Sequence, residues 1–220
     1  MVQNHFLKIP KDSEVSILEY GSGPGLLTEI LVQNHKIKKY VVVEPEKLFR
    51  NMTAERIKEN ANIEVLNSVT EKFVSDDQFD FVVMTATYHH MCDKVKAIHN
   101  IFANLKKDGK LIMGEVFLPN YKFDKKYNPS NKLEFVEKVI QYTAEQIRFM
   151  PNPKNEDVSD QIKTAMLDIL RIEELKVSID ILRDQLEKVG FKEIKIDLMK
   201  GKNKSVDYNS LGWYHIEATK

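Results

Sequence analysis

Short apolar runs rich in β-branched residues alternate with helical patterns along the first half of the chain. The five runs span residues 15–20, 40–44, 63–66, 79–85 and 110–116. Strands separated by helices form βαβ units, whose right-handed crossovers place helices on both faces of a mainly parallel sheet. Residues 41–43 and 81–84 are apolar throughout, as expected of strands covered on both faces. The pattern therefore predicts an α/β fold.

The chain changes character after the fifth run. Residues 117–177 contain no convincing strand and are too long for a structureless loop, so we predict a helical insert. Its first helix would follow Asn131 and Glu134, which resemble a capping box, and would end before Pro151. The apolar positions predicted to face the core are Val136, Ile140, Ile147 and Met150 in this helix, and Val158, Ile162, Ala165, Ile169 and Ile172 in a second one.

The last part of the chain predicts one more helix and two more strands. A helix over 178–189 would bury Ile179, Leu182 and Leu186 and stop at Gly190, a common C-cap residue. Residues 192–199 and 212–218 alternate like strands, and the polar stretch 200–210 between them predicts an exposed loop. The expectation is thus a single domain, residues 1–220, with a seven-stranded, mostly parallel sheet and an insert at 117–177.

A glycine-rich turn, Gly21-Ser22-Gly23-Pro24-Gly25, joins the first strand to the following helix. Glycines let a ligand approach the backbone closely, and a helix start offers free amide donors to a carboxylate or phosphate. The G-x-G-x-x-G spacing of dinucleotide-binding proteins is broken at Leu26. Glu44 follows the second strand, 19 positions after Gly25, where a carboxylate would accept hydrogen bonds from ribose hydroxyls. The pattern predicts a ligand that contains a nucleoside.

Five ordered motifs resemble those of the class I S-adenosylmethionine-dependent methyltransferases. The motifs are the glycine turn with Glu19, the pair Glu44-Pro45, and the segments 80–83, 104–112 and 186–191. The resemblance covers roughly residues 13–116 and 178–220 and leaves the helical insert unmatched. It implies a Rossmann-like fold, with S-adenosylmethionine as cofactor and S-adenosylhomocysteine as product.

The resemblance also implies roles for individual residues. The three glycines of the turn would cradle the methionine portion, Glu19 would help to hold its amino group, and Glu44 would hold the ribose. An acidic residue that often follows the third strand near the adenine is replaced here by Ser68 and Val69, which become the candidates. The complete set of predicted cofactor contacts is Glu19, Gly21, Ser22, Gly23, Gly25, Glu44, Pro45, Ser68, Val69 and Thr85.

Residues 85–90, which follow the fourth strand, should border the transferable methyl group. Methyl transfer from a sulfonium depends mainly on alignment and desolvation, although a base helps an acidic nucleophile. His90, His89 and Tyr88 are therefore catalytic candidates, with packing and local hydrogen bonding as the alternative. Glu115 would orient a substrate or pair with a lysine. Cys92 is expected to be at least half-buried, and no metal site is expected because a lone cysteine cannot complete a thiolate site.

Seven of the chain's twenty aromatic residues lie in the insert between positions 117 and 149. Such a cluster predicts a lid that covers an apolar or planar acceptor. Packing of the insert onto the sheet, or a dimer contact, explains the same pattern. We therefore expect a monomer or a homodimer.

Charge and composition limit the classes of substrate and partner that the protein is expected to bind. The 33 basic and 33 acidic residues balance, which argues against a broad nucleic-acid-binding face. The Asn/Asp-Pro-Pro-aromatic motif of many enzymes that methylate nucleic-acid amino groups is absent at residues 85–88. The leading hypothesis is a methyltransferase for a small-molecule acceptor; the alternatives are a macromolecular (protein or RNA) methyltransferase and a non-catalytic S-adenosylmethionine-binding protein.

The cellular location is predicted from three features that the sequence lacks. The first residues lack the apolar core of a signal peptide, and no apolar run reaches the roughly 18 residues needed for a membrane span. One cysteine allows no internal disulfide, which suits a reducing compartment. We therefore expect a cytoplasmic protein.

Overall fold

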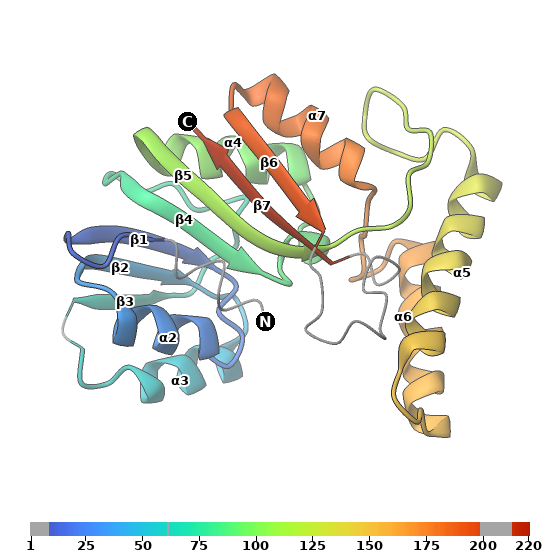
Figure 1. Cartoon of the computed structure of the whole chain (residues 1–220), viewed down its shortest axis with the longest axis horizontal. Helices are drawn as coiled ribbons and strands as arrows, with labels where there is room; N and C mark the ends of the chain where they lie inside the picture. The colour runs from blue at the N-terminus through green and yellow to red at the C-terminus, as the bar shows by residue number, and fades with distance from the viewer. Residues whose placement is uncertain (1–8, 61, 199–212) are drawn as a thin grey trace.

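A computed structural model of the chain describes residues 9–60, 62–198 and 213–220. They form a seven-stranded sheet with the order β3-β2-β1-β4-β5-β7-β6. The strands are β1 (Val15–Tyr20), β2 (Ile37–Val43), β3 (Ile63–Leu66), β4 (Phe79–Thr85), β5 (Leu105–Val116), β6 (Lys192–Leu198) and β7 (Trp213–Thr219). β7 is antiparallel to both of its neighbours, and the pairs among β1 to β5 are parallel. The predicted Rossmann-like, mostly parallel sheet is confirmed (Figure 1).

Helices cover both faces of the sheet, as the βαβ pattern predicted. α2 (Leu26–Asn34) and α3 (Lys47–Arg56) contact each other on one face, while α4 (Lys94–Asn104) and α7 (Ile179–Val189) do so on the other. Successive strand side chains point to opposite faces, so Ile17 belongs to the core beneath α2 and Leu18 to the larger core beneath α4 and α7.

Several predicted boundaries shift in the structure. β2 begins three residues earlier than predicted, and β5 begins at Leu105, because α4 passes directly into the strand. The sequence pattern did not indicate α3, whose buried face is reduced to Thr53. In α7, Ile181 is buried and the predicted Ile179 is only partly buried. The predicted loop 200–210 and the ends of its flanking strands at 199 and 212 lie outside the described residues.

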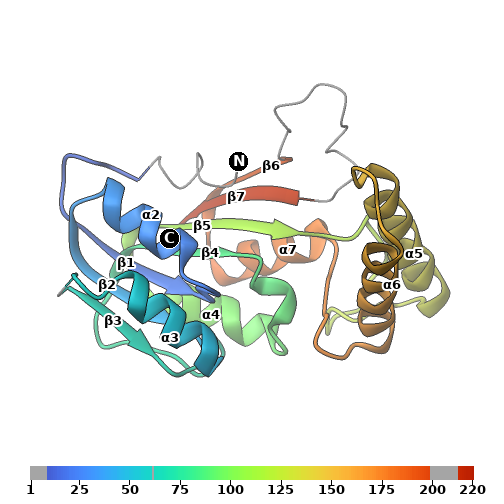
Figure 2. The ribbon, with the colours of Figure 1, turned by 90° about the horizontal axis from the view of Figure 1, so that it is seen from below.

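The insert contains two helices, α5 (Lys132–Phe149) and α6 (Asn155–Leu170), which lie side by side beyond the carboxyl ends of β4 and β5 (Figures 1 and 2). The Asn131 side chain caps α5 by accepting from the amides of Leu133 and Glu134. The predicted buried stripe of α5 was wrong: Phe135, Val139 and Tyr142 face the core. Large side chains of the predicted stripes that are instead exposed are Ile140, Ile162 and Ile172.

Aromatic residues of the insert supply much of its packing. Phe117, Tyr121, Phe135 and Tyr142 are buried in the same core as the sheet residues beneath α4 and α7. Packing onto the sheet therefore accounts for these four positions. Among the described helices, none is both long and apolar enough to cross a membrane.

Candidate active site

The glycine turn between β1 and α2 adopts a backbone that favours glycine at three positions. Gly21, Gly23 and Gly25 have φ values of 68°, 51° and 83°. The amide of Gly21 donates to the carbonyl of Val43 on β2 at 2.9 Å. A Cβ atom at Gly21 would lie 2.3 Å from Thr87 Oγ1, whereas one at Gly23 would meet nothing within 4 Å. Gly21 is thus required for close contact with the loop after β4.

The carboxylate of Glu44 ties the glycine turn to the end of β2. Its Oε2 accepts from the Gly23 amide at 3.0 Å, and its Oε1 accepts from the Glu46 amide at 2.9 Å. The residue is only 5% exposed. Each carboxylate oxygen has a second lone pair, so both oxygens keep an acceptor site for a further donor.

A pocket of about 410 Å³ opens beside this turn, at the carboxyl ends of β1 to β4. The predicted site residues that line it are Gly21, Pro45, Ser68, Val69 and His90. This is the edge of an open parallel sheet where ligands bind. Thr87 also lines the pocket and lies in the segment 85–90 that was expected to border the methyl group. The wall residues that the sequence did not indicate are Val43, Thr70, Glu71, Lys72, Met91, Cys92, Asp93 and Lys96.

Two of the other predicted cofactor residues, Ser22 and Thr85, do not line the pocket. Ser22 is buried, and its hydroxyl lies 2.9 Å from that of Thr53 on α3. Thr85 pairs with Gly114 inside the sheet. Thr87 lines the pocket in its place, and Thr87 Oγ1 donates to the Thr85 carbonyl at 3.0 Å. The pocket contact is therefore made by Thr87, two residues beyond the end of β4, and not by Thr85.

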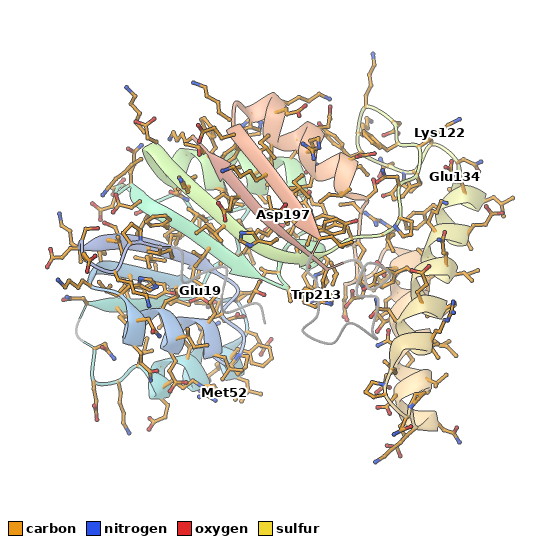
Figure 3. All side chains as sticks on the ribbon, viewed as in Figure 1. Glu19, Met52, Lys122, Glu134, Asp197 and Trp213 are labelled. Carbon is orange, nitrogen blue, oxygen red and sulfur yellow. The ribbon has the colours of Figure 1, made fainter. Side chains whose placement is uncertain are left out.

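Glu19 lies near the end of β1 (Figure 3) and is fully buried. Thr28 and Tyr40 each donate a hydroxyl to its Oε2 at 2.6 Å. Its Oε1 has no hydrogen-bond partner among the described residues. Burial raises the pKa of this carboxyl to about 7, against the hydrogen bonds from Thr28 and Tyr40, which lower it. Glu19 therefore joins β1 to α2 and β2 through buried hydrogen bonds.

Glu115, at the end of β5, organises the turn that follows β4. Its fully buried carboxylate accepts from the backbone amides of Thr87, Tyr88 and Val116 at 2.9, 2.6 and 2.8 Å. Its Oε1 lies 2.7 Å from His89 Nδ1. Burial alone would raise the pKa of Glu115, but the hydrogen bond and charge of His89 and the backbone amides lower it overall. Glu115 is therefore an anion that orients His89, and its predicted pairing with a lysine was wrong.

Comparison with known proteins decides the family. A model described as a methyltransferase domain matches residues 3–150, more than half of the chain. The chain belongs to the class I S-adenosylmethionine-dependent methyltransferases. A search of curated proteins found no match.

Solved structures share the fold of this methyltransferase at low identity. The N-methyltransferase NodS from Bradyrhizobium japonicum WM9, in complex with S-adenosylhomocysteine, is 14% identical with a TM-score of 0.62, over 100% of this chain and 83% of that one. A possible histamine N-methyltransferase from Thermotoga maritima is 20% identical with a TM-score of 0.61, over 100% and 87%. A Haloferax volcanii methyltransferase complexed with the Trm112 activator is 12% identical with a TM-score of 0.65, over 99% and 88%.

The three catalytic candidates of the methyltransferase occupy different environments. Tyr88 is buried, its hydroxyl donates to Gln185 on α7, and its ring lies beside Phe117, so the structure does not bring it to the pocket. His89 is mostly buried against Glu115. His90 is exposed and lines the pocket, which makes it the candidate nearest to a bound ligand.

Two features near the pocket were not predicted. Cys92 is exposed and lines the pocket, so its expected burial was wrong. Glu174 lies between α6 and α7, and its Oε2 atom is 3.9 Å from Nε2 of His89. No sequence motif identifies Glu174 as a site residue, because it is distant from the histidines in the sequence and only the folded chain brings them together.

Proposed function

We propose that this methyltransferase binds S-adenosylmethionine in the pocket beside the glycine turn and methylates a small-molecule acceptor. When bound, S-adenosylmethionine supplies an electrophilic methyl group on a sulfonium. The observation that supports the proposal most is that residues from four separate strand ends, Gly21, Pro45, Ser68 and Thr87, converge on one pocket.

The residues around the pocket fit a sulfonium nucleoside. Open space beside Gly23 leaves the backbone accessible to an amino-acid moiety. The free acceptor sites of Glu44 suit ribose hydroxyls, and the unpaired Oε1 of Glu19 suits a donor relayed from an ammonium group. Pro45 and Val69 offer apolar surface for a base. In this proposal Ser22 and Gly25 shape the turn, and Gly25 does so by close contact with Thr53.

The chain's own residues supply alignment and exclude water. Glu115 fixes the turn 87–90 through three amides and so holds His90 at the pocket wall. In the proposed reaction, His90 borders the acceptor and accepts or releases a proton there if the acceptor requires it. His89 is held by Glu115, and Tyr88 anchors the turn in the core.

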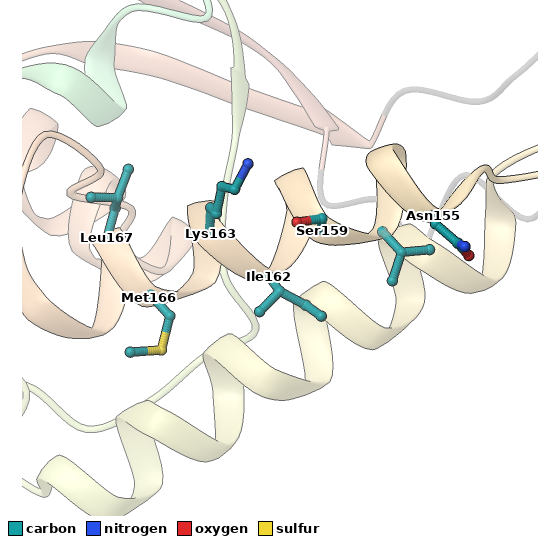
Figure 4. Close-up of a pocket in the computed structure, with 7 residues that line it drawn as sticks. Asn155, Ser159, Ile162, Lys163, Met166 and Leu167 are labelled. Carbon is teal, nitrogen blue, oxygen red and sulfur yellow. The ribbon is translucent and has the colours of Figure 1, made fainter.

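The proposed acceptor is small and has an apolar part. The insert, residues 117–177, serves in this proposal as the lid over the acceptor, although within the described part of the chain it contributes no lining residue to the cofactor pocket. Its helices expose large apolar side chains, and a shallow, mainly apolar hollow on α6 is lined by Val158, Ile162 and Met166 (Figure 4). Closure of these helices over the pocket would bring apolar surface to the acceptor.

The acceptor class can be tested without knowing the substrate. The purified enzyme would be incubated with S-adenosylmethionine labelled in its methyl group and with two fractions of a cell extract, one of small molecules and one of protein and RNA. We expect label to enter products only in the small-molecule fraction, because the chain has no excess of basic residues to hold a nucleic acid and the apolar surface of the insert suits a small acceptor. Enzyme-dependent label in acid-precipitable protein or RNA would contradict the proposal. Boiled enzyme serves as the control.

A further inference from the structure

Three potential metal ligands meet next to the pocket. His89 and His90 come from the short turn after β4, and Glu174 comes from the connection between α6 and α7. One ligand atom from each of the three residues lies within 4.8 Å of the other two, and the two imidazole rings are 4.0 Å apart. Tetrahedral ligands of one Zn²⁺ lie roughly 3.4 Å apart, so side-chain movements of at most about 1.4 Å would bring the three ligand atoms to that spacing.

Each histidine has one ring nitrogen committed to an acceptor. The Glu115 carboxylate already accepts from three amides, so His89 Nδ1 at 2.7 Å from it carries the proton. His90 Nδ1 lies 3.1 Å from the Glu173 carbonyl, which can only accept. The Nε2 atoms are therefore the ring nitrogens left to face a metal ion. Metal-binding histidines show this arrangement, with the second nitrogen donating to a carboxylate or carbonyl.

Glu174 can act as a ligand without leaving a buried charge unpaired. Its Oε2 bonds to Lys176, but Lys176 Nζ also lies 2.9 Å from Asp168 Oδ2. Asp168 further accepts from the Lys176 amide at 2.9 Å. Lys176 thus keeps a counter-ion when Glu174 turns toward the histidines.

The backbone holds the cluster together across the sequence. The amide of Leu175 donates to the carbonyl of His89 at 2.9 Å. This bond and the contact of His90 with Glu173 join the connection after α6 to the turn after β4. The three side chains therefore meet on two segments that are fixed to each other, as a preorganised site requires.

We propose that His89, His90 and Glu174 form a three-ligand site for a divalent transition-metal ion at the wall of the cofactor pocket. Two imidazoles and one carboxylate match the ligand set of open Zn²⁺ and Fe²⁺ sites and are unlike the all-oxygen sites of Mg²⁺ and Ca²⁺. An open coordination position beside His90 would bind an oxygen or nitrogen atom of the acceptor and lower its pKa. With the ion bound, the ion would replace His90 as the group that assists loss of an acceptor proton. That role rests on the proposed function, whereas binding of the ion does not.

The test measures metal binding alone, with Co²⁺ as a spectroscopic probe. Chelator-treated enzyme is titrated with Co²⁺, and the visible d–d absorption is followed. We expect one ion per chain, displaced by Zn²⁺, and at least a tenfold loss of affinity in both His90→Ala and Glu174→Gln. His99→Ala is the matched control, because His99 is exposed on α4 and outside the cluster; its affinity should equal that of the wild type.

The results that overturn the inference are distinct from those that overturn the function. No Co²⁺ absorption in the wild type, or equal affinity in the wild type and both cluster variants, contradicts the metal site. Circular dichroism of each variant shows whether the fold is retained, and His89→Gln is a second variant if one fails to fold. S-adenosylhomocysteine is titrated separately into metal-free wild type. Binding there without Co²⁺ binding removes only the metal site.

Discussion

Alanine at position 21 is expected to lower the free energy of unfolding by about 2 to 5 kcal/mol. The positive φ of 68° costs an L-residue roughly 1 to 2 kcal/mol, and overpacking adds about 1 to 3 kcal/mol. The overpacking arises because the new Cβ would lie 2.3 Å from Thr87 Oγ1 and 2.5 Å from its Cγ2. Urea unfolding of Gly21→Ala against the wild type measures the loss. On the proposed function, affinity for S-adenosylhomocysteine also falls.

Two further variants separate backbone strain from the clash. Gly23→Ala has a positive φ of 51° but meets nothing within 4 Å, so we expect a loss of only about 1 kcal/mol. In the Gly21→Ala/Thr87→Ala double variant the two closest atoms, Oγ1 and Cγ2, are gone and only the Thr87 Cβ at 3.0 Å remains. The double-mutant cycle should therefore show a favourable coupling of at least about 1 kcal/mol. Equal losses of unfolding free energy for Gly21→Ala and Gly23→Ala, with no coupling to Thr87, would contradict the close contact between the glycine turn and the loop after β4.

Replacement of Glu19 by glutamine should stabilise the fold, and more so as the pH rises. Burial raises the pKa of Glu19 from 4.5 to about 7. A raised folded-state pKa means that stability is complete below the unfolded value and is lost as the pH rises through the folded value. Between pH 5 and pH 8 the wild type should therefore lose about 2 kcal/mol of stability relative to the glutamine variant. Urea unfolding at both pH values measures the difference.

The glutamine side chain preserves the local hydrogen bonds. Its carbonyl oxygen can accept from Thr28 and Tyr40, as Glu19 Oε2 does. Glu14→Gln is the control, because Glu14 is exposed one residue before β1 and its replacement should change stability little at either pH. A pH-independent difference between wild type and Glu19→Gln would mean that the carboxyl is not buried as the structure has it.

The sequence predicts the sheet well because its strands carry strong local signals. The runs at 15–20, 63–66 and 79–85 match β1, β3 and β4 residue for residue. α3 was missed because Thr53 is its buried residue, which leaves no apolar stripe to detect. In α5 the helix was predicted but its buried face was wrong, because apolar residues occur around the helix and tertiary contacts choose among them.

The site was predictable where a motif lies at a strand end. The glycine turn, Pro45, Ser68, Val69 and His90 follow this rule, and the fold gathers several of them at one pocket. Thr87 lies in the segment 85–90 that was expected to border the methyl group, although Thr85 was the named cofactor contact. Glu174 was not predictable as a site residue, because only the path of the chain after α6 brings it to the histidines. Glu115 was a candidate, but its bonds to three amides depend on how that turn folds back.

The ribose contact can be examined by calorimetry with S-adenosylhomocysteine. Glu44→Ala should weaken binding by roughly 1.5 to 3 kcal/mol if the carboxylate bonds to the sugar. Part of this loss would come from freeing the Gly23 and Glu46 amides, so Glu44→Gln, which keeps an acceptor oxygen, should lose less. Equal affinity in the wild type and Glu44→Ala would remove Glu44 from the cofactor site.

The most direct test of the whole account is a calorimetric titration of the wild type with S-adenosylhomocysteine and, separately, with NAD. The account predicts one binding site of about micromolar affinity for S-adenosylhomocysteine and no heat with NAD, because Leu26 breaks the dinucleotide spacing. Heat with NAD and none with S-adenosylhomocysteine would contradict it.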